Sequence, residues 1–341
     1  MSQSFLITLF SFLCVINNLY SQSKKFNKEW STIEQLEVDG KITSALEKVN
    51  LLRAKALKNK NNEQLLKALL FRWKFMQIID EKSQEKILIE VNNEIKKQVF
   101  PNKQLLEMYL ASFLETHLNN NFWNIKNRTH TEDAALKDYR TWDLNTFLNQ
   151  ISIHYQNALT PYLPLATLNT ENISQLLLSS PTSRKYKPTI FDIIAHKALN
   201  FYTNSRNRVN KPKDEFLINN DSYYSNSSTF VENNLITNDT SSLLFKALET
   251  YQKLENIHSQ QKNEKAHIFN TLQRIQFIKK NHIGNTTDEL YLESLKKLTN
   301  EFKNSNHIYA INIELAKAYR GLANIKENNG DYKYPNYNKI A

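Results

Sequence analysis

The stretch TSALEKVNLLRAKALKNKNNEQLLKALLFRWKF, residues 43–75, decides the fold class. Its apolar residues recur every three or four positions, first from Ala45 to Leu57 and again from Leu65 to Phe75. That spacing places them on one face of an α-helix. The polar residues 58–62, KNKNN, separate the two runs, and Thr43-Ser44 can cap the first one. The stretch therefore predicts two antiparallel helices joined by a short polar turn.

The same periodicity continues on both sides of this pair. It predicts further helices at 30–38, 83–99, 101–114, 147–158, 189–202, 243–257, 266–278, 290–302 and 308–325. The chain of 341 residues has only four glycines, although hairpin-rich β folds and phosphate-cradling loops depend on glycine. We therefore expect an all-α fold of antiparallel helical hairpins, arranged as a tetratricopeptide-like α-solenoid.

Three segments interrupt the helical pattern and predict the domain organisation. Residues 119–146 mix large aromatic residues with charges, Pro161, Pro164 and Pro181 bound a loop-rich interval, and residues 214–242 are polar. A long loop without structure of its own is uncommon inside a compact domain. We expect a helical repeat-like domain at 22–213, a polar loop or linker at 214–242, and helical hairpins at 243–341. A new helix should begin at Asn338, so we expect the array to be truncated at Ala341.

The N-terminal residues predict export. Residues 5–16, FLITLFSFLCVI, form an apolar run that is too short to span a bilayer and suits a signal peptide, although no Lys or Arg precedes Lys24. A buried N-terminal helix is the alternative. We expect a signal peptide at 1–21, cleavage after Ser21, and a location in the periplasm or at the outer membrane or cell surface of a Gram-negative bacterium. Cys14, the only cysteine, lies inside this run, so the mature chain would have no disulfide or thiolate chemistry.

The net charge of +10 comes from basic residues that are mostly dispersed among acids. One stretch, 183–213, is strongly basic, with eight basic residues against Asp192 alone: Arg184, Lys185, Lys187, Lys197, Arg206, Arg208, Lys211 and Lys213. Aromatic residues are interleaved with them, namely Tyr186, Phe191, Phe201 and Tyr202. Basic residues with aromatics are typical of single-strand nucleic-acid binding, but here the aromatics have helical spacing, which indicates core packing. We expect no nucleic-acid partner.

No motif in the chain predicts catalysis. There is no glycine-rich phosphate loop and no Gly-x-Ser-x-Gly elbow. The eight histidines never form a close metal-ligand pair; they are His117, His130, His154, His196, His258, His267, His282 and His307. We therefore nominate no catalytic, cofactor-binding or metal-binding residue, and we expect no enzyme activity, no cofactor and no small-molecule substrate.

Three residue pairs have both a functional and a structural interpretation: Asp192 with His196, Arg140 with Asp143, and Trp123 with Trp142. The first could orient a catalytic histidine, but pairs four residues apart usually stabilise a helix. The second is expected to be a buried pair that fixes the corner at 119–146. The third could stack on a sugar, but core packing is the simpler interpretation. We expect structural roles for all three.

Four segments together resemble the N-terminal region of the large alpha-2-macroglobulin family proteins of Bacteroidetes. The first is WSTIEQLEVDGKITSALEKVNLLRAKAL, 30–57, with the following NNEQLLKALL, and the second is NNNFWNIKNRT, 119–129, with DYRTWDLNTF, 138–147. The third is YKPTIFDIIAHKALNFY, 186–202, and the fourth is ALETYQKLENIH, LQRIQFIKKNH and DELYLESLKKLTNEFKNS within 247–305. They occur in order and extend over nearly the whole mature chain.

This resemblance implies a tetratricopeptide-like helical region that precedes macroglobulin domains in an endopeptidase inhibitor. The family's bait region and Cys-Gln thioester have no counterpart in this sequence, so no functional residue is carried over. We expect an exported helical interaction region whose partners are proteins: the downstream macroglobulin domains, envelope proteins, and proteases. The alternative is a stand-alone tetratricopeptide-like scaffold of an envelope complex; a nucleic-acid binder and a helical enzyme are less supported alternatives.

Overall fold

The computed structural model describes residues 24–129, 138–176, 180–209, 212–327 and 330–341. The predicted signal peptide, 1–21, lies outside them. Within this part of the chain the regular structure is helical, with isolated β-bridges and no strand, so the predicted all-α fold is confirmed. None of the helices described combines the length and apolarity needed to cross a membrane.

The chain divides into two compact units, which are described separately. Unit 1 comprises residues 1–181 with 189–194, and unit 2 comprises 182–188 with 195–341. Helix α11 (Ile190–Tyr202) contributes residues to both, as does the short α10 (Pro181–Arg184). The predicted linker at 214–242 therefore lies within unit 2 rather than at the division between the units.

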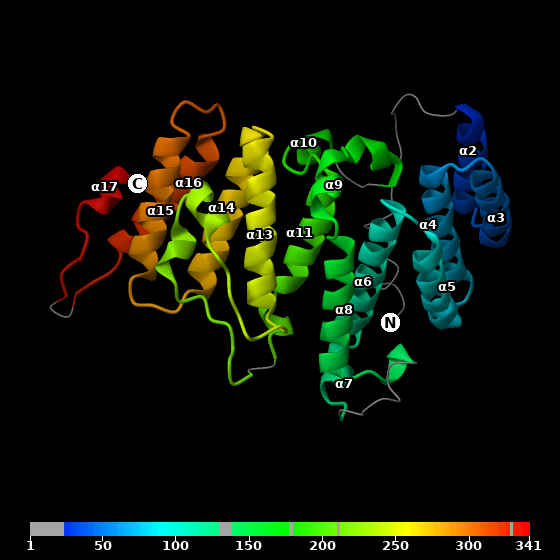
Figure 1. Ribbon diagram of the computed structural model, residues 1–341, viewed down its shortest axis with the longest axis horizontal. Coiled ribbons are helices and arrows are strands. Elements are labelled where there is room, and N and C mark those ends of the chain that lie inside the picture. The colour runs from blue at the N-terminus through cyan, green and yellow to red at the C-terminus, as the bar shows by residue number, and fades with distance from the viewer. Residues whose placement is uncertain (1–23, 130–137, 177–179, 210–211, 328–329) are drawn as a thin grey trace. The chain divides into compact units, whose positions relative to one another are not determined.

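Unit 1 consists of helices that pack against their neighbours in chain order (Figure 1). Their bounds are α2 (Lys24–Val38), α3 (Ile42–Lys58), α4 (Asn62–Ile79), η1 (Glu81–Ser83), α5 (Gln84–Lys97), α6 (Asn102–Asn120), α7 (Phe122–Lys126), η3 (Tyr139–Thr141), α8 (Leu144–Ala158), α9 (Tyr162–Thr167) and η4 (Thr170–Leu176). The closest packing joins α3 to α4 and α6 to α8. This arrangement is that of successive hairpins, and a regular solenoid repeat stays a prediction.

Helix α4 lies at the centre of this packing. Most of its residues from Gln64 to Phe75 are buried, because α3, α5, α6 and η4 all contact it. Its aromatic rings interlock with those of neighbouring helices: Phe71 lies 4.9 Å from Trp30 of α2, and Trp73 stacks on Tyr109 of α6 at 5.1 Å. The broadly apolar sequence of this helix reflects burial on several sides.

Three helical hairpins turn through a residue with left-handed backbone. Gly40 (φ 72°) follows α2, Lys60 (φ 52°) follows α3, and Lys262 (φ 54°) follows α13. In the last two turns an asparagine comes next and caps the following helix: Asn61 and Asn263 each accept a backbone N–H. The predicted Thr43-Ser44 cap is wrong, because α3 already begins at Ile42 and has no side-chain cap.

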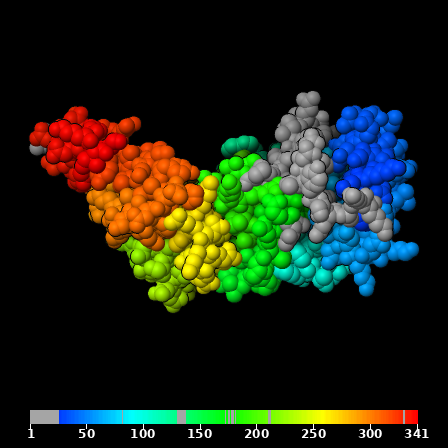
Figure 2. Space-filling view, turned by 90° about the horizontal axis from the view of Figure 1, so that it is seen from above, coloured from blue at the N-terminus to red at the C-terminus, as the bar shows by residue number. Residues whose placement is uncertain are grey.

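Unit 2 is built on two long hairpins, with shorter helices packed around them. Its elements are η5 (Ser205–Asn207), η6 (Asp221–Tyr224), α12 (Ser227–Glu232), α13 (Leu243–Gln260), α14 (Glu264–Asn281), α15 (Thr287–Glu301), α16 (Tyr309–Ala323) and α17 (Tyr337–Ile340). Helix α13 packs on α14, α14 on α15, and α15 on α16. The C-terminal residues, red in Figure 2, pack against α16.

The polar segment 214–242 is largely irregular, as predicted, but it is packed into unit 2. Its apolar residues Phe216, Ile218, Tyr224 and Phe230 are buried. The short helices η6 and α12 lie within the segment and contact α13, α14 and α15. Gln252 of α13 donates its side-chain N–H groups to two carbonyls of the segment. A polar composition therefore does not mark a free linker here.

Candidate functional site

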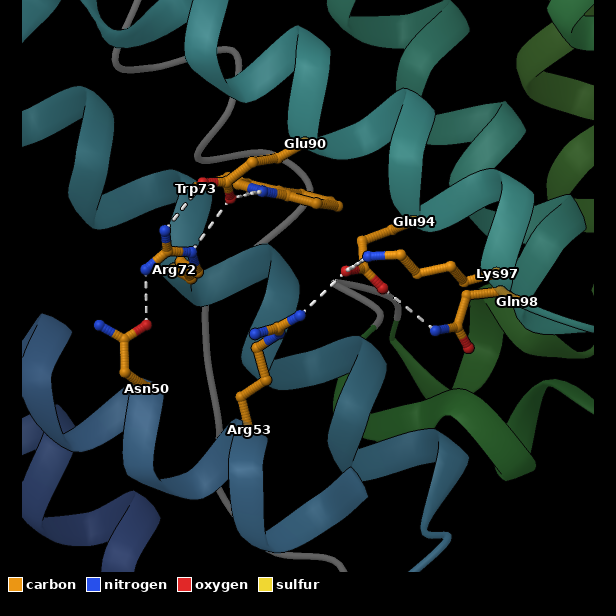
Figure 3. A network of polar contacts seen from close by, with 8 residues as sticks. All are labelled: Asn50, Arg53, Arg72, Trp73, Glu90, Glu94, Lys97 and Gln98. Carbon is orange, nitrogen blue, oxygen red and sulfur yellow. Dashed lines mark hydrogen bonds and ion pairs between the residues drawn. The ribbon is translucent and has the colours of Figure 1, made fainter. Parts of the chain in front are cut away.

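A network of charged side chains connects three consecutive helices of unit 1 (Figure 3). Glu90 of α5 accepts both arms of the Arg72 guanidinium of α4, at 3.0 and 2.8 Å, and also the indole N–H of Trp73 at 3.2 Å. Arg72 donates a further hydrogen bond of 2.6 Å to Asn50 of α3. A two-armed arginine–carboxylate pair fixes orientation as well as distance.

One turn along α5, Glu94 makes the second half of this network. It accepts a hydrogen bond of 2.9 Å from Arg53 of α3 and one of 3.3 Å from Gln98, and the ammonium of Lys97 lies 3.6 Å away. Its side chain is only 8% exposed, so the arginine is needed to offset the cost of burying its charge. Together the two glutamates set α3, α4 and α5 in register.

The electrostatics of this network favour fixed ion pairs over proton transfer. Partial burial raises the pKa of Glu90, but hydrogen bonding to Arg72 and the charge of that guanidinium more than offset this, so the net pKa lies below its ordinary value. The same pairing raises the pKa of Arg72. A carboxylate held ionised in this way is poorly suited to act as a general acid or base near neutral pH.

A buried lysine forms a second unusual feature of unit 1. Lys67 of α4 is 3% exposed, and its ammonium lies 4.2 Å from the ring centre of Trp30 and 5.7 Å from that of Phe71. Burial lowers its pKa to about 8, although Glu34 and Glu63 act in the opposite direction. Burial also raises the pKa of both glutamates. The aromatic faces attract the cation and partly compensate for its desolvation.

Neighbouring contacts attach helix α2 to α4. The indole N–H of Trp30 donates a hydrogen bond of 2.6 Å to Gln64, and Lys74 forms an ion pair with Glu37. Both side chains on α4 are buried. These polar residues of α4 therefore serve to position α2.

In unit 2 the corresponding feature is the buried Arg274 of α14. Its guanidinium pairs with Glu255 of α13 at 2.6 Å, and both side chains have no exposed surface. It also donates to the carbonyl of Tyr223 and, at 2.9 Å, to that of Ser225, while its centre lies 4.1 Å from the ring centre of Phe230. One side chain thus holds the 214–242 segment against both helices of a hairpin.

Histidines near this pair are buried as well. His258 has no exposed surface and His267 is 8% exposed. Burial lowers the pKa of His267, and its ring meets Phe302 edge-on at 5.5 Å. Across the residues that the structure describes, no group of three or more His, Cys, Asp and Glu side chains is arranged to hold a metal ion.

The Asp192–His196 pair has a structural role at Asp192. The Asp192 carboxylate accepts hydrogen bonds from the backbone N–H and hydroxyl of Thr189, at 2.9 and 2.7 Å, and its own N–H donates to that hydroxyl. This reciprocal arrangement is a capping box at the start of α11. The ring of His196 lies 5.4 Å from that of Phe269. Asp192 therefore stabilises the start of the helix by capping it.

The predicted buried pair of Arg140 and Asp143 is wrong. Arg140 is 55% exposed and forms a two-armed pair with Asp138, with Glu85 at 3.2 Å. Asp143 instead caps α8 by accepting the N–H of Thr146 at 2.8 Å. Asp143 takes this role because it directly precedes α8, where an aspartate can accept a hydrogen bond from an otherwise unpaired backbone N–H.

The two tryptophans of this region have different environments. Trp142 is 6% exposed and meets Phe147 edge-on at 5.3 Å, so its predicted core position is confirmed. Trp123 is 69% exposed, so the core prediction is wrong for it. Its ring lies against Phe122 and beneath the ammonium of Lys126. With one ring buried, the pair forms no shared platform for a sugar.

The basic stretch 183–213 contains core aromatics, as predicted, with one exception. Phe191, Phe201 and Tyr202 have no exposed surface. Tyr186 is only half-buried and belongs to a group of rings and lysines on the surface of unit 2.

Comparison with known protein families, curated proteins and solved structures finds no match for this chain.

Sequence patterns did not identify Lys67 or Arg274. Both lie among buried residues of their helices, and that position was the available signal: Lys67 lies between Leu66 and Ala68, and Arg274 follows Leu272 and precedes Ile275. A cation at a core-facing position requires a partner. The partner itself could not be identified, because Arg274 meets Glu255 19 residues away and Tyr223 51 residues away.

Proposed function

We propose that this chain is an exported helical scaffold that binds other proteins and carries out no chemistry itself. The observation that supports a scaffold is the network of α3, α4 and α5, in which Arg72, Arg53, Glu90 and Glu94 tie three consecutive helices together. A surface fixed in this way loses little conformational entropy when a partner binds. The buried Arg274 provides the same kind of support in unit 2.

The particular assignment is the N-terminal interaction region of an alpha-2-macroglobulin-like endopeptidase inhibitor of the periplasm or outer membrane. It rests on the resemblance of the four sequence segments. The scaffold would position the downstream macroglobulin domains, which would perform the trapping of proteases. The second candidate is a stand-alone tetratricopeptide-like scaffold of an envelope complex, which the same helical architecture would serve equally well.

An inhibition assay tests the division of labour. Purified residues 22–341 are incubated with a panel of endopeptidases and a protein substrate, and we expect the helical segment alone to leave proteolysis unchanged. Stoichiometric inhibition by the segment would overturn the proposal that it is a scaffold only. Cell fractionation with N-terminal sequencing tests export, which predicts a mature chain beginning at Gln22.

The reading frame beyond the codon for Ala341 separates the two candidates. Macroglobulin β-sandwich domains encoded there support the inhibitor, whereas a stop codon supports the stand-alone scaffold. In-cell crosslinking of the tagged chain adds the partner's identity. Recovery of no protein partner under conditions where the chain is exported and folded would contradict both candidates.

A further inference from the structure

One face of unit 2 combines aromatic rings with lysines. Tyr186, four residues before α11 begins, shares a hydrogen bond of 3.2 Å with Tyr309 of α16, and its ring lies 5.3 Å from that of Phe269 of α14. Lys265 of α14 lies over the Tyr186 ring at 4.3 Å, and Lys187 lies over Phe269 at 5.9 Å. With the exposed Lys185, these six residues form the basic-aromatic face.

This face is held together by contacts between elements far apart in sequence. Tyr186 and Tyr309 are 123 residues apart, and their hydrogen bond joins residues 182–188 to α16. Farther along the same two long helices, the side chain of Gln276 of α14 hydrogen-bonds to Glu314 of α16. These contacts position the rings of the face before any partner arrives.

The charge of the face is largely uncompensated. An aromatic ring attracts an ammonium group without neutralising it, so the Tyr186 ring does not take the place of a carboxylate partner for Lys265. Among the contacts described, Lys185 and Lys265 have no carboxylate partner. The nearest paired lysine on α16 is Lys317, which Glu314 neutralises at 2.7 Å.

Beside these charges lies an exposed apolar pair. Tyr309 is 50% exposed, and Ile313, one turn along α16, is 53% exposed. Protein interfaces favour tyrosine and place apolar anchors beside polar contacts. A partner that fits both features has carboxylates for the lysines and a large apolar side chain for the Tyr309–Ile313 pair.

We propose that the basic-aromatic face binds an acidic peptide segment of a protein partner, one that carries a large apolar residue among its Asp and Glu residues. This inference rests on the proposed scaffold function and specifies the chemistry of its partner. A nucleic acid fits less well, because stacking bases need open ring faces, whereas Lys265 covers Tyr186, and Lys187 and His196 lie against Phe269.

Fluorescence anisotropy with labelled synthetic peptides tests the proposal on the purified mature chain. The probe is a peptide of Asp and Glu around a central Leu-Phe pair, and the comparison peptide replaces its acids with Asn and Gln. We expect the acidic peptide to bind more tightly at low salt, and Lys265→Glu to weaken it about tenfold or more. Tyr309→Ala should weaken both the acidic peptide and the neutral one.

The matched control is Lys297→Glu, which makes the same charge change at an exposed position of α15 in the same unit. It should leave peptide binding within about twofold of the unchanged chain. Equal effects of the two charge reversals, or no preference for the acidic peptide, would overturn the proposal. Tighter binding of a single-stranded oligothymidine would overturn it in favour of nucleic acid.

The test is separable from that of the scaffold function. If crosslinking still captures a protein partner and Lys265→Glu leaves that capture unchanged, the scaffold proposal stands and the basic-aromatic face is not its binding surface. If no partner is captured at all, the scaffold proposal itself is overturned, whatever the peptide-binding result. Far-UV circular dichroism of each variant shows whether loss of binding reflects unfolding.

Discussion

At the scale of single residues, Arg274 has the largest structural consequence. Its guanidinium neutralises Glu255 and satisfies two carbonyls of the 214–242 segment, all without exposure to solvent. Arg274→Met should lower the free energy of unfolding by about 3–5 kcal/mol, because it leaves a buried carboxylate without a counter-charge. Urea denaturation followed by circular dichroism measures this loss.

The matched double variant, Arg274→Met with Glu255→Leu, separates the contribution of the ion pair from that of the hydrogen bonds to the 214–242 segment. Removing both charges should recover part of the stability, because an apolar pair replaces an uncompensated buried ion. Full recovery is not expected, since the carbonyls of Tyr223 and Ser225 still lose their donor. A double variant as unstable as the single one would show that the charge pair contributes little and that the carbonyl contacts dominate.

Removal of the charge at Lys67 should stabilise the fold, whereas removal of the charge at Arg274 should destabilise it. Its pKa in the folded state is lowered to about 8 from an ordinary value of 10.5, so the unfolded chain binds the proton more readily between these values. Stability should therefore rise as pH increases through this window. Lys67→Met removes the buried cation and should raise the free energy of unfolding at pH 7 by about 1–3 kcal/mol, the lower value applying if Trp30 compensates strongly.

Denaturation at several pH values between 7 and 9.5 checks the Lys67 prediction. The difference in stability between the variant and the unchanged chain should shrink as the pH rises, because the lysine becomes neutral by itself. Restricting the comparison to this difference cancels the titration of tyrosines common to both proteins. A constant difference across the range would show that Lys67 is destabilising for a reason other than its charge.

At the scale of helices and turns, the left-handed residues offer a direct test of the hairpin geometry. Lys262 adopts φ 54°, a region that an L-residue occupies at a cost of about 1–2 kcal/mol. Lys262→Gly should relieve most of this, less the entropy that glycine adds to the unfolded chain, and so stabilise by up to about 1 kcal/mol. Thermal unfolding of the whole chain, followed by circular dichroism, measures this gain in stability.

Gly40 supplies the reverse experiment. A Cβ added there meets nothing within 4 Å, so the positive φ of 72° alone decides the effect. Gly40→Ala should destabilise by about 1 kcal/mol, which matches the gain at Lys262 in size and opposes it in sign. If both substitutions destabilised equally, the side chain of Lys262 would contribute contacts that outweigh its backbone strain.

The α3–α5 network makes a prediction about the rigidity of those helices. Glu90→Gln keeps the shape of the side chain but removes the negative charge that pairs with Arg72. It should lower the free energy of unfolding by about 1–2 kcal/mol. Hydrogen exchange should increase in α3 and α5 more than in α8. Glu47→Gln, on the exposed side of α3, is the matched control and should change stability by less than about 0.5 kcal/mol.

How far sequence predicts this fold also depends on the scale. The helices followed from apolar periodicity, since an amphipathic pattern such as Leu65–Phe75 needs only local spacing. The candidate sites did not, because Arg53 meets Glu94 41 residues away and Arg72 meets Glu90 18 residues away. Such pairs arise from the packing of helices, which periodicity does not specify. Asp143 shows the converse, a local capping rule overriding a guessed pair.

At the scale of the whole molecule, the surface charge should control association. The chain carries a net charge of +10, and on the basic-aromatic face the described contacts give Lys185 and Lys265 no carboxylate partner. Long-range attraction raises association rates mainly for partners of opposite charge, and salt screens it. Binding of the acidic peptide should therefore slow with salt mainly through its association rate, while the apolar contact at Tyr309 governs dissociation.

The division into two compact units can be tested with the tryptophans of the chain itself. All four, Trp30, Trp73, Trp123 and Trp142, belong to unit 1, whereas helices of both units contribute to circular dichroism. Arg274→Met weakens a core contact of unit 2. If each unit unfolds on its own core, the variant should shift part of the dichroism transition to lower urea and leave the tryptophan fluorescence transition in place. A parallel shift of both signals would show that the two cores unfold as one cooperative system, and the same Arg274→Met protein then measures how strongly they are coupled.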